Sequence, residues 1–344
     1  MSSNTAHKSI SGRVRSPIWN VGLKVLVSLI LAYLIYVQVV QKEGLDQFWS
    51  NLVQQLQAGL PIYIIAAIAL MPINFICENV KWRRLLRSVD NLSRWTSMKS
   101  ILTGSTLGIF TPNRLGEYGG RVLYVPAKDN WKVVYATAVG NLGQLIVLLS
   151  FGWIGMLFFF GEQLDIPIMI QYASIFLGIG GMVVLGLLYF NIDIIIQLIN
   201  RISWLKKIKH KVASWNAFQH LEILRSYDAA TLLNVLQWSG IKYAVYSTQY
   251  LLLLWFFDID VPLLLAFAGI ASIYLIQTAI PLPAFIGLVV RGELALLIWG
   301  HYSDNASHIL GATFTLWIIN LLIPSIIGLL LIYKINILKS LGYD

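Results

Sequence analysis

Six long apolar stretches dominate the chain, and each could cross a membrane as a helix. A helix needs about 20 predominantly apolar residues to span hydrocarbon about 30 Å thick. The predicted spans cover residues 21–40, 60–77, 133–160, 167–190, 229–257 and 309–333. The pattern therefore predicts an all-α fold, a polytopic membrane helix bundle.

Two further apolar segments, 101–125 and 262–300, are each interrupted by a proline that stops the helix, Pro112 and Pro281. Basic residues flank the first segment on both sides, and acidic residues flank the second. Because short basic loops stay in the cytoplasm, we predict two re-entrant helical hairpins that enter from opposite faces, which indicates an inverted repeat. Counted as spans, they bring the number of membrane segments from six to eight. The alternative, in which 262–300 makes two full spans around a cytoplasmic turn, stays open.

Lys and Arg gather on one side of the predicted spans, in 78–100, in 191–228 and in the C-terminal tail, whereas the opposite loops are acidic or neutral. The positive-inside rule then predicts cytoplasmic N- and C-termini in the cell (inner) membrane. The basic N-terminus and first apolar run resemble a signal peptide, but no small-x-small site follows, so we expect an uncleaved span. The expected organisation is a tail of 1–20, a transmembrane domain over 21–335 and a tail of 336–344.

Composition agrees with a membrane protein. Hydrophobic residues make up 57% of the chain, charged residues 12%, and the mean hydropathy is +0.71, whereas a soluble domain has about 25% charged residues. The net charge of +9 follows from the one-sided basic loops, so we expect no nucleic-acid partner. Cys77 is the sole cysteine, which excludes an intrachain disulfide and a cysteine-based metal cluster.

Two polar motifs, 111–121 and 281–293, interrupt the apolar segments, and each combines proline, glycine, arginine and glutamate. Ionisable side chains within a membrane are costly and mark a functional site by default. Backbone amides at helix N-termini attract anions, and the planar arginine fork suits phosphate. We therefore predict that 112–120 and 281–287 approach each other inside the bundle and form one anion site.

The candidate residues follow from these motifs. Asn74 and Glu78 join them, because residues four apart share one helix face. The predicted substrate-binding residues are Asn113, Arg114, Glu117, Arg121, Arg291, Glu293, Asn74 and Glu78. The predicted structural hinges are Pro112, Gly116, Pro281, Pro283 and Gly287. In the alternative interpretation, Arg114–Glu117 and Arg291–Glu293 are ion pairs that cap helix ends, and Glu78 pairs with Lys81 at the membrane interface.

Signatures of catalysis are missing from the sequence. The five histidines form no His-x-x-x-His or HExxH pattern, and no phosphate-loop signature is present. We therefore predict no catalytic residue, no metal site, no cofactor and no direct use of ATP. The expected class is a membrane protein that is not an enzyme.

The spacing of three motifs resembles a known family. Asn74, Glu78, Lys81 and Trp82, then residues 112–117, then Pro281, Pro283, Gly287 and Glu293 are similar to the lysylphosphatidylglycerol synthase transmembrane family. The resemblance covers residues from about 20 to 335. Members commonly carry Pro-x-Pro-Gly-Gly-x-Gly in the last motif, and Ala284 and Phe285 replace the glycine pair here.

This resemblance implies a flippase-like transporter, which moves an anionic phospholipid or a lipid-linked substrate between leaflets. The implied partners are membrane lipids, anionic phospholipid or polyprenyl phosphate, with a homo-oligomer left open. In two-domain relatives a separate soluble domain makes the aminoacyl lipid, so we expect no synthase activity from this chain. Two alternatives remain: an enzyme or accessory factor in polyprenyl-phosphate-linked sugar transfer, and a membrane scaffold that transports nothing.

Overall fold

A computed structural model describes residues 45–58, 61–87, 91–163, 167–192, 194, 223–280 and 286–335 of the 344-residue chain. These residues form helices and connecting segments, without a β-strand among them, so the predicted all-α class is confirmed. The helices are α2 (Leu45–Ala58), α3 (Ile62–Leu86), α4 (Arg94–Gly108), α5 (Gly116–Val122), η1 (Ala127–Asp129), α6 (Asn130–Gln163), α7 (Ile168–Phe190), α10 (Ala229–Phe256), α11 (Leu263–Ala279), α12 (Ile286–Trp299), α13 (Ala306–Trp317), η4 (Ile318–Leu322) and α14 (Ile323–Tyr333).

Four helical segments in the described part of the chain are long and apolar enough to cross a membrane. They are Ile62–Leu86, Ala127–Gly161, Ile168–Phe190 and Ala306–Tyr333, and they correspond to four of the six predicted spans. Helix α10 has 28 residues and ends one residue short of the end of the predicted span 229–257, although it does not belong to these four. The first predicted span, 21–40, and both predicted tails lie outside the described residues.

The second span extends further than its hydropathy indicates. It was predicted to end at residue 77, but α3 continues to Leu86. The prediction that Lys81 lies in a cytoplasmic loop is therefore wrong, since its side chain is only 1% exposed. Glu78 pairs with Lys81 inside the bundle, so the helix does not need to stop at Glu78.

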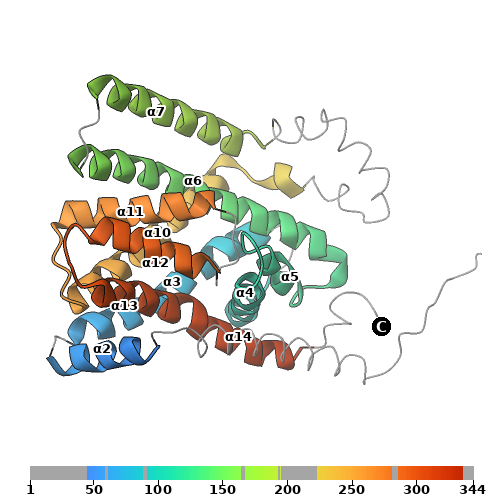
Figure 1. The fold of residues 1–344 in the computed structure, drawn as a ribbon. Coiled ribbons are helices and arrows are strands. Elements are labelled where there is room, and N and C mark those ends of the chain that lie inside the picture. Colours follow the sequence, from blue (N-terminus) through green and yellow to red (C-terminus); the bar gives the residue numbers. More distant parts are fainter. Residues whose placement is uncertain are drawn as a thin grey trace, which may run out of the picture.

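Both interrupted segments are pairs of short helices. In the first, α4 and α5 have 15 and 7 residues. In the second, α11 and α12 have 17 and 14 residues. At about 1.5 Å per residue, each is shorter than hydrocarbon about 30 Å thick. Figure 1 shows α11 and α12 side by side along α10, with α4 and α5 in the half of the bundle where α14 ends.

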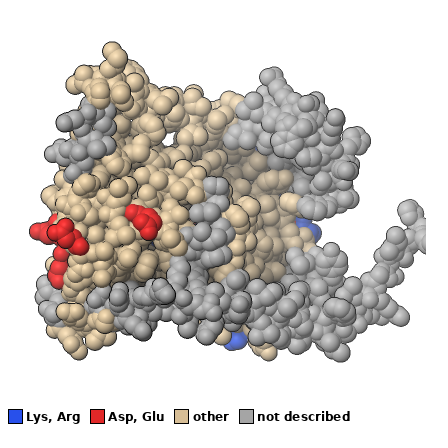
Figure 2. All heavy atoms as spheres, in the orientation of Figure 1, with Lys and Arg blue, Asp and Glu red and all other residues tan. Residues whose placement is uncertain are grey.

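The two ends of the bundle differ in charge. Figure 2 shows red carboxylates toward the end that carries the α10–α11 and α12–α13 loops, and blue basic side chains toward the opposite end. The acidic loops contain Asp258, Asp260 and Asp304, whereas Arg83 and Arg84 lie in the last turn of α3. This separation is the pattern from which the orientation in the membrane was predicted.

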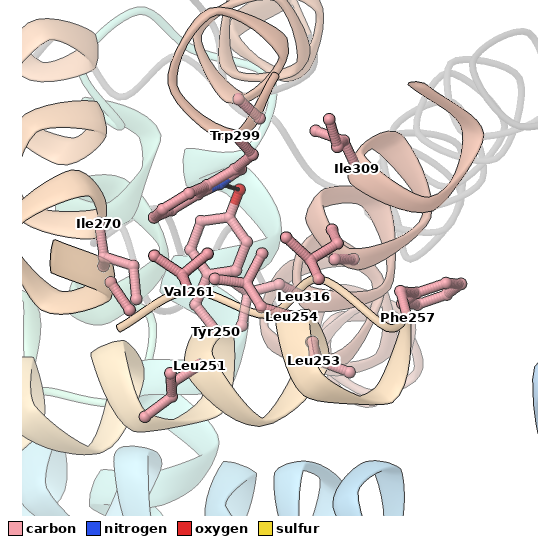
Figure 3. Close-up of a cluster of buried hydrophobic side chains, with 14 of the residues drawn as sticks. Tyr250, Leu251, Leu253, Leu254, Phe257, Val261, Ile270, Trp299, Ile309 and Leu316 are labelled. Carbon is pink, nitrogen blue, oxygen red and sulfur yellow. Dashed lines mark hydrogen bonds between the residues drawn. The ribbon is translucent and has the colours of Figure 1, made fainter. Parts of the chain in front are cut away.

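The second hairpin, formed by α11 and α12, is fixed to the bundle by a large apolar cluster (Figure 3). Tyr250 of α10 lies at its centre, and its hydroxyl accepts a hydrogen bond from Trp299 Nε1 of α12 at 3.1 Å. The same hydroxyl lies 2.7 Å from Thr313 Oγ1 of α13. Leu254 and Leu316 pack around this polar centre. Because the hydroxyl of Tyr250 bonds to both α12 and α13, it holds these two helices against α10.

The first hairpin, formed by α4 and α5, depends on close approach of the two helix backbones. A Cβ atom at Gly120 would lie 2.5 Å from Gly104 Cα on α4, and one at Gly116 would lie 2.1 Å from Leu107 O. Neither site has room for a side chain, so the crossing of α4 and α5 requires glycine. Gly116, predicted as a hinge, is thus needed for tight packing.

Candidate functional site

A cavity of about 580 Å³ lies in the middle of the bundle, within the size range of small-molecule sites. Its walls come from α3, α4, α5, α6, α10, α11, α12, η4 and the loop between α4 and α5. One part of the wall is apolar or aromatic, with Leu145, Leu148 and Tyr243 among its residues. The rest carries charges and carboxamides. The cavity therefore presents both an apolar and a strongly polar surface.

Both sequence motifs reach this cavity. Of the predicted site residues, those that line it are Asn74, Glu78, Asn113, Arg114, Glu117, Gly287 and Arg291. Both hairpins also contribute to one buried apolar cluster, which contains Ile109, Leu288 and Trp317. Pro281 and Pro283 lie outside the described residues. The structure thus brings together two motifs about 170 residues apart in the sequence.

Glu78 is the centre of a buried ionic network. Its carboxylate oxygens lie 2.8 Å from Lys81 Nζ, 2.8 Å from an Arg121 guanidinium nitrogen and 2.8 Å from Lys242 Nζ. Gln144 Oε1 accepts from both lysines at 3.2 Å. A carboxylate shared by three cations and supported by an amide offsets much of the cost of burying these charges.

Arg121 is enclosed by protein and lies behind the cavity wall. It is 1% exposed, pairs with Glu78 and Glu117, and lies 5.1 Å from the centre of the Trp82 ring. Its two carboxylate partners are on different helices, α3 and α5. Arg121 therefore ties the first hairpin to α3, and it does not reach the cavity directly.

Arg114 is held differently, in the turn between α4 and α5. Asn113 and Arg114 have left-handed backbone, with φ of 49° and 57°. This conformation costs roughly 1–2 kcal/mol per L-residue. Thr111 stabilises the turn by accepting a hydrogen bond from the Gly116 amide at 2.7 Å. The strained turn directs a side chain that is 42% exposed and 3.6 Å from the Glu117 carboxylate toward the cavity.

Arg291 enters the cavity from the second hairpin. It donates to Gln277 Oε1 at 2.9 Å and to Tyr246 Oη at 3.0 Å, and it lies 6.0 Å from the Tyr274 ring centre. Among the ion pairs between described residues, none joins it to Glu293. Glu293 is exposed and does not line the cavity. Arg291 is therefore a cation with neutral hydrogen-bond partners.

The site carries an excess of positive charge. Among the described residues, two carboxylates and five cationic side chains stand around and directly behind the cavity wall, a surplus of three positive charges. The carboxylates are Glu78 and Glu117, and the cations are Lys81, Arg114, Arg121, Lys242 and Arg291. In a medium of low dielectric constant such a surplus favours binding of an anion.

Three important residues were not among the candidates. Lys242 stands in the predicted span 229–257, and a lysine within an apolar run is itself a signal of function. Gln144 and Gln277 also lie in apolar runs, where carboxamides most often join helices. A further signal was invisible in sequence: η4 is a π-helical turn that brings Asn320 into the cavity wall, and such turns are frequent at functional sites.

Comparison with known families shows where the chain belongs. The family model described as lysylphosphatidylglycerol synthase TM region matches residues 21–328. The chain belongs to this family. The matched range contains both motifs and all residues that line the cavity. A comparison with curated proteins finds no match. Family membership and the apolar helices together establish a membrane protein with several helices.

Proposed function

We propose that the chain binds the phosphate of an anionic lipid in the central cavity and moves that lipid between the leaflets. The observation that carries the proposal is the surplus of positive charge at a cavity inside an apolar helix bundle. A phosphate would supply the missing negative charge. Membrane lipids are an abundant source of phosphate for a protein of this kind.

In this proposal Arg114, Arg291 and Lys242 make the contacts with phosphate, because all three line the cavity. Arg121 is a positioning residue, because its guanidinium is already paired with the carboxylates of Glu78 and Glu117. Glu78 and Glu117 compete with the phosphate for the cations. This competition keeps binding weak enough for the lipid to leave.

The proposed membrane arrangement follows the charge pattern. The two hairpins enter from opposite faces, and both termini face the cytoplasm. The cell membrane is the proposed location. In this arrangement Ile109 of the first hairpin and Leu288 of the second contribute to one buried cluster with Trp317. Movement of either hairpin would open the site toward one leaflet.

A leaflet-resolved assay tests this function. Purified chain is reconstituted in vesicles with phosphatidylglycerol that carries a fluorophore on its acyl chain, and a membrane-impermeant quencher reports the outer leaflet. We expect Arg114→Ala and Arg291→Ala to lower the translocation rate per folded molecule by at least about tenfold, as one lost charged hydrogen bond permits. Lys132→Ala is the control, because Lys132 pairs with Asp129 away from the cavity.

The purely structural explanation makes a different prediction. If these arginines only stabilise the bundle, both variants lower the yield of folded protein and leave the rate per folded molecule unchanged. That result in both variants would remove the case for a phosphate site.

A further inference from the structure

Three polar atoms at the cavity have no hydrogen-bond partner among the described residues, and they differ in whether they donate or accept a hydrogen bond. They are Arg114 Nε, Asn74 Oδ1 and Tyr274 Oη, all buried. All three residues line the cavity. Asn74 and Tyr274 are 6% and 5% exposed, so bulk water has little access to their side chains. A buried polar atom without a partner is costly, so each indicates part of a ligand.

Arg114 Nε is a donor, and Glu117 Oε2 lies 3.6 Å away, beyond hydrogen-bond distance, so a phosphate oxygen can be its acceptor. Asn74 Oδ1 requires the opposite. Its orientation is fixed by a chain of hydrogen bonds: Asn320 Nδ2 donates to Leu316 O at 3.3 Å, and Asn320 Oδ1 accepts from Asn74 Nδ2 at 3.0 Å. The oxygen of Asn74 is therefore left as an acceptor. An ionised phosphate has no proton to donate, so the ligand must carry a second group that donates.

The donating group is not an ammonium, because no carboxylate among the described residues of the cavity is free to receive one. Glu78 already faces three cations, and Glu117 faces Arg114 and Arg121. An ammonium would add a charge to a site that already has three too many positive ones. A hydroxyl group donates a hydrogen bond without adding charge.

We infer that the ligand of this cavity is a phosphate ester whose headgroup carries hydroxyl groups and no ammonium, as a polyol or a sugar does. The inference rests on the proposed function and names its substrate class. Arg114 and Arg291 receive the phosphate. Asn74 Oδ1 and Tyr274 Oη receive headgroup hydroxyls. Tyr243, Tyr246 and the carboxamide of Asn113 also line the wall, and they suit a ring that bears several hydroxyls.

Binding of short-chain lipids to the detergent-purified full chain tests this inference. The probes are dioctanoyl phosphatidylinositol, dioctanoyl phosphatidic acid, dioctanoyl phosphatidylethanolamine and free inositol 1-phosphate. We expect phosphatidylinositol to bind about tenfold more tightly than phosphatidic acid, as unmet buried hydrogen bonds predict. Phosphatidylethanolamine should bind most weakly of the three lipids.

Variants connect the preference to the unpartnered atoms. Asn74→Ala should abolish the preference for phosphatidylinositol over phosphatidic acid. Tyr274→Phe removes a single oxygen atom and should reduce the same ratio, which keeps the test valid if Asn74→Ala does not fold. Asn141→Ala is the matched control, because Asn141 donates to Tyr118 and does not line the cavity.

The outcomes separate the two proposals. Equal affinity for all three lipids, or a preference for phosphatidylethanolamine, overturns the inferred headgroup and leaves a lipid-phosphate site standing. Absence of binding by every lipid overturns the proposed function and the inference with it. Binding of inositol 1-phosphate as tightly as the lipid supports the headgroup chemistry but overturns a lipid as its carrier.

Discussion

Replacing Glu78 with glutamine is the most informative single change in the buried network. The substitution keeps the size and shape of the side chain and removes its negative charge. Lys81, Arg121 and Lys242 each lie 2.8 Å from the carboxylate. Arg121 keeps its second partner, Glu117. Lys242 is 18% exposed, so its ammonium is less deeply buried. The loss therefore falls mainly on Lys81, which is 1% exposed.

The expected size follows from this burial. Removing one partner of a buried ion pair typically costs about 3–5 kcal/mol, because the other charge remains buried without compensation. The total stability of a folded domain is about 5–15 kcal/mol. We therefore expect Glu78→Gln to remove a large part of the free energy of unfolding and to lower the midpoint of thermal unfolding in detergent.

A second variant shows whether the charge of Lys81 is the cause. Lys81→Met removes that charge, so the double variant Glu78→Gln/Lys81→Met should recover part of the stability, as coupled neighbours do in a double-mutant cycle. Asp304→Asn is the control, since Asp304 is an exposed carboxylate in the α12–α13 loop; it should stay within about 0.5 kcal/mol of the parent. A loss below about 1 kcal/mol in Glu78→Gln, or no recovery in the double variant, would refute the reasoning.

Three further predictions concern packing, orientation and the phosphate contact. Gly120→Ala should destabilise the protein by about 1–3 kcal/mol in a denaturation assay, because its Cβ would meet the backbone of α4; Gly119→Ala, which has nothing within 4 Å, should cause a smaller change. With the native cysteine replaced, an impermeant thiol reagent applied to intact cells should label cysteine at Asp304 and not at Lys132, and the reverse pattern would contradict the orientation. Arg114→Lys keeps the charge but loses the planar fork, so lipid translocation per folded molecule should fall, whereas an unchanged rate would show that charge alone suffices.

The sequence by itself determined the class of protein and the two motifs. Apolar runs about 20 residues long predict membrane helices regardless of their neighbours. Proline and glycine are local signals, so the breaks in the two hairpins were visible before the tertiary structure. The four-residue spacing of Asn74 and Glu78 predicted that they share one face of α3, and both line the cavity.

Tertiary structure decided how the charges pair. Arg121 and Arg114 stand in the same motif, yet one is enclosed by Glu78 and Glu117 while the other reaches the cavity. Arg291 and Glu293 are two residues apart, a spacing that places side chains on different faces of a helix, so Glu293 points away once α12 has formed. Lys242 became a site residue because α10 packs beside α3 and brings its ammonium to the Glu78 carboxylate. Such pairings depend on which helices are neighbours, and the pattern of one chain does not contain that information.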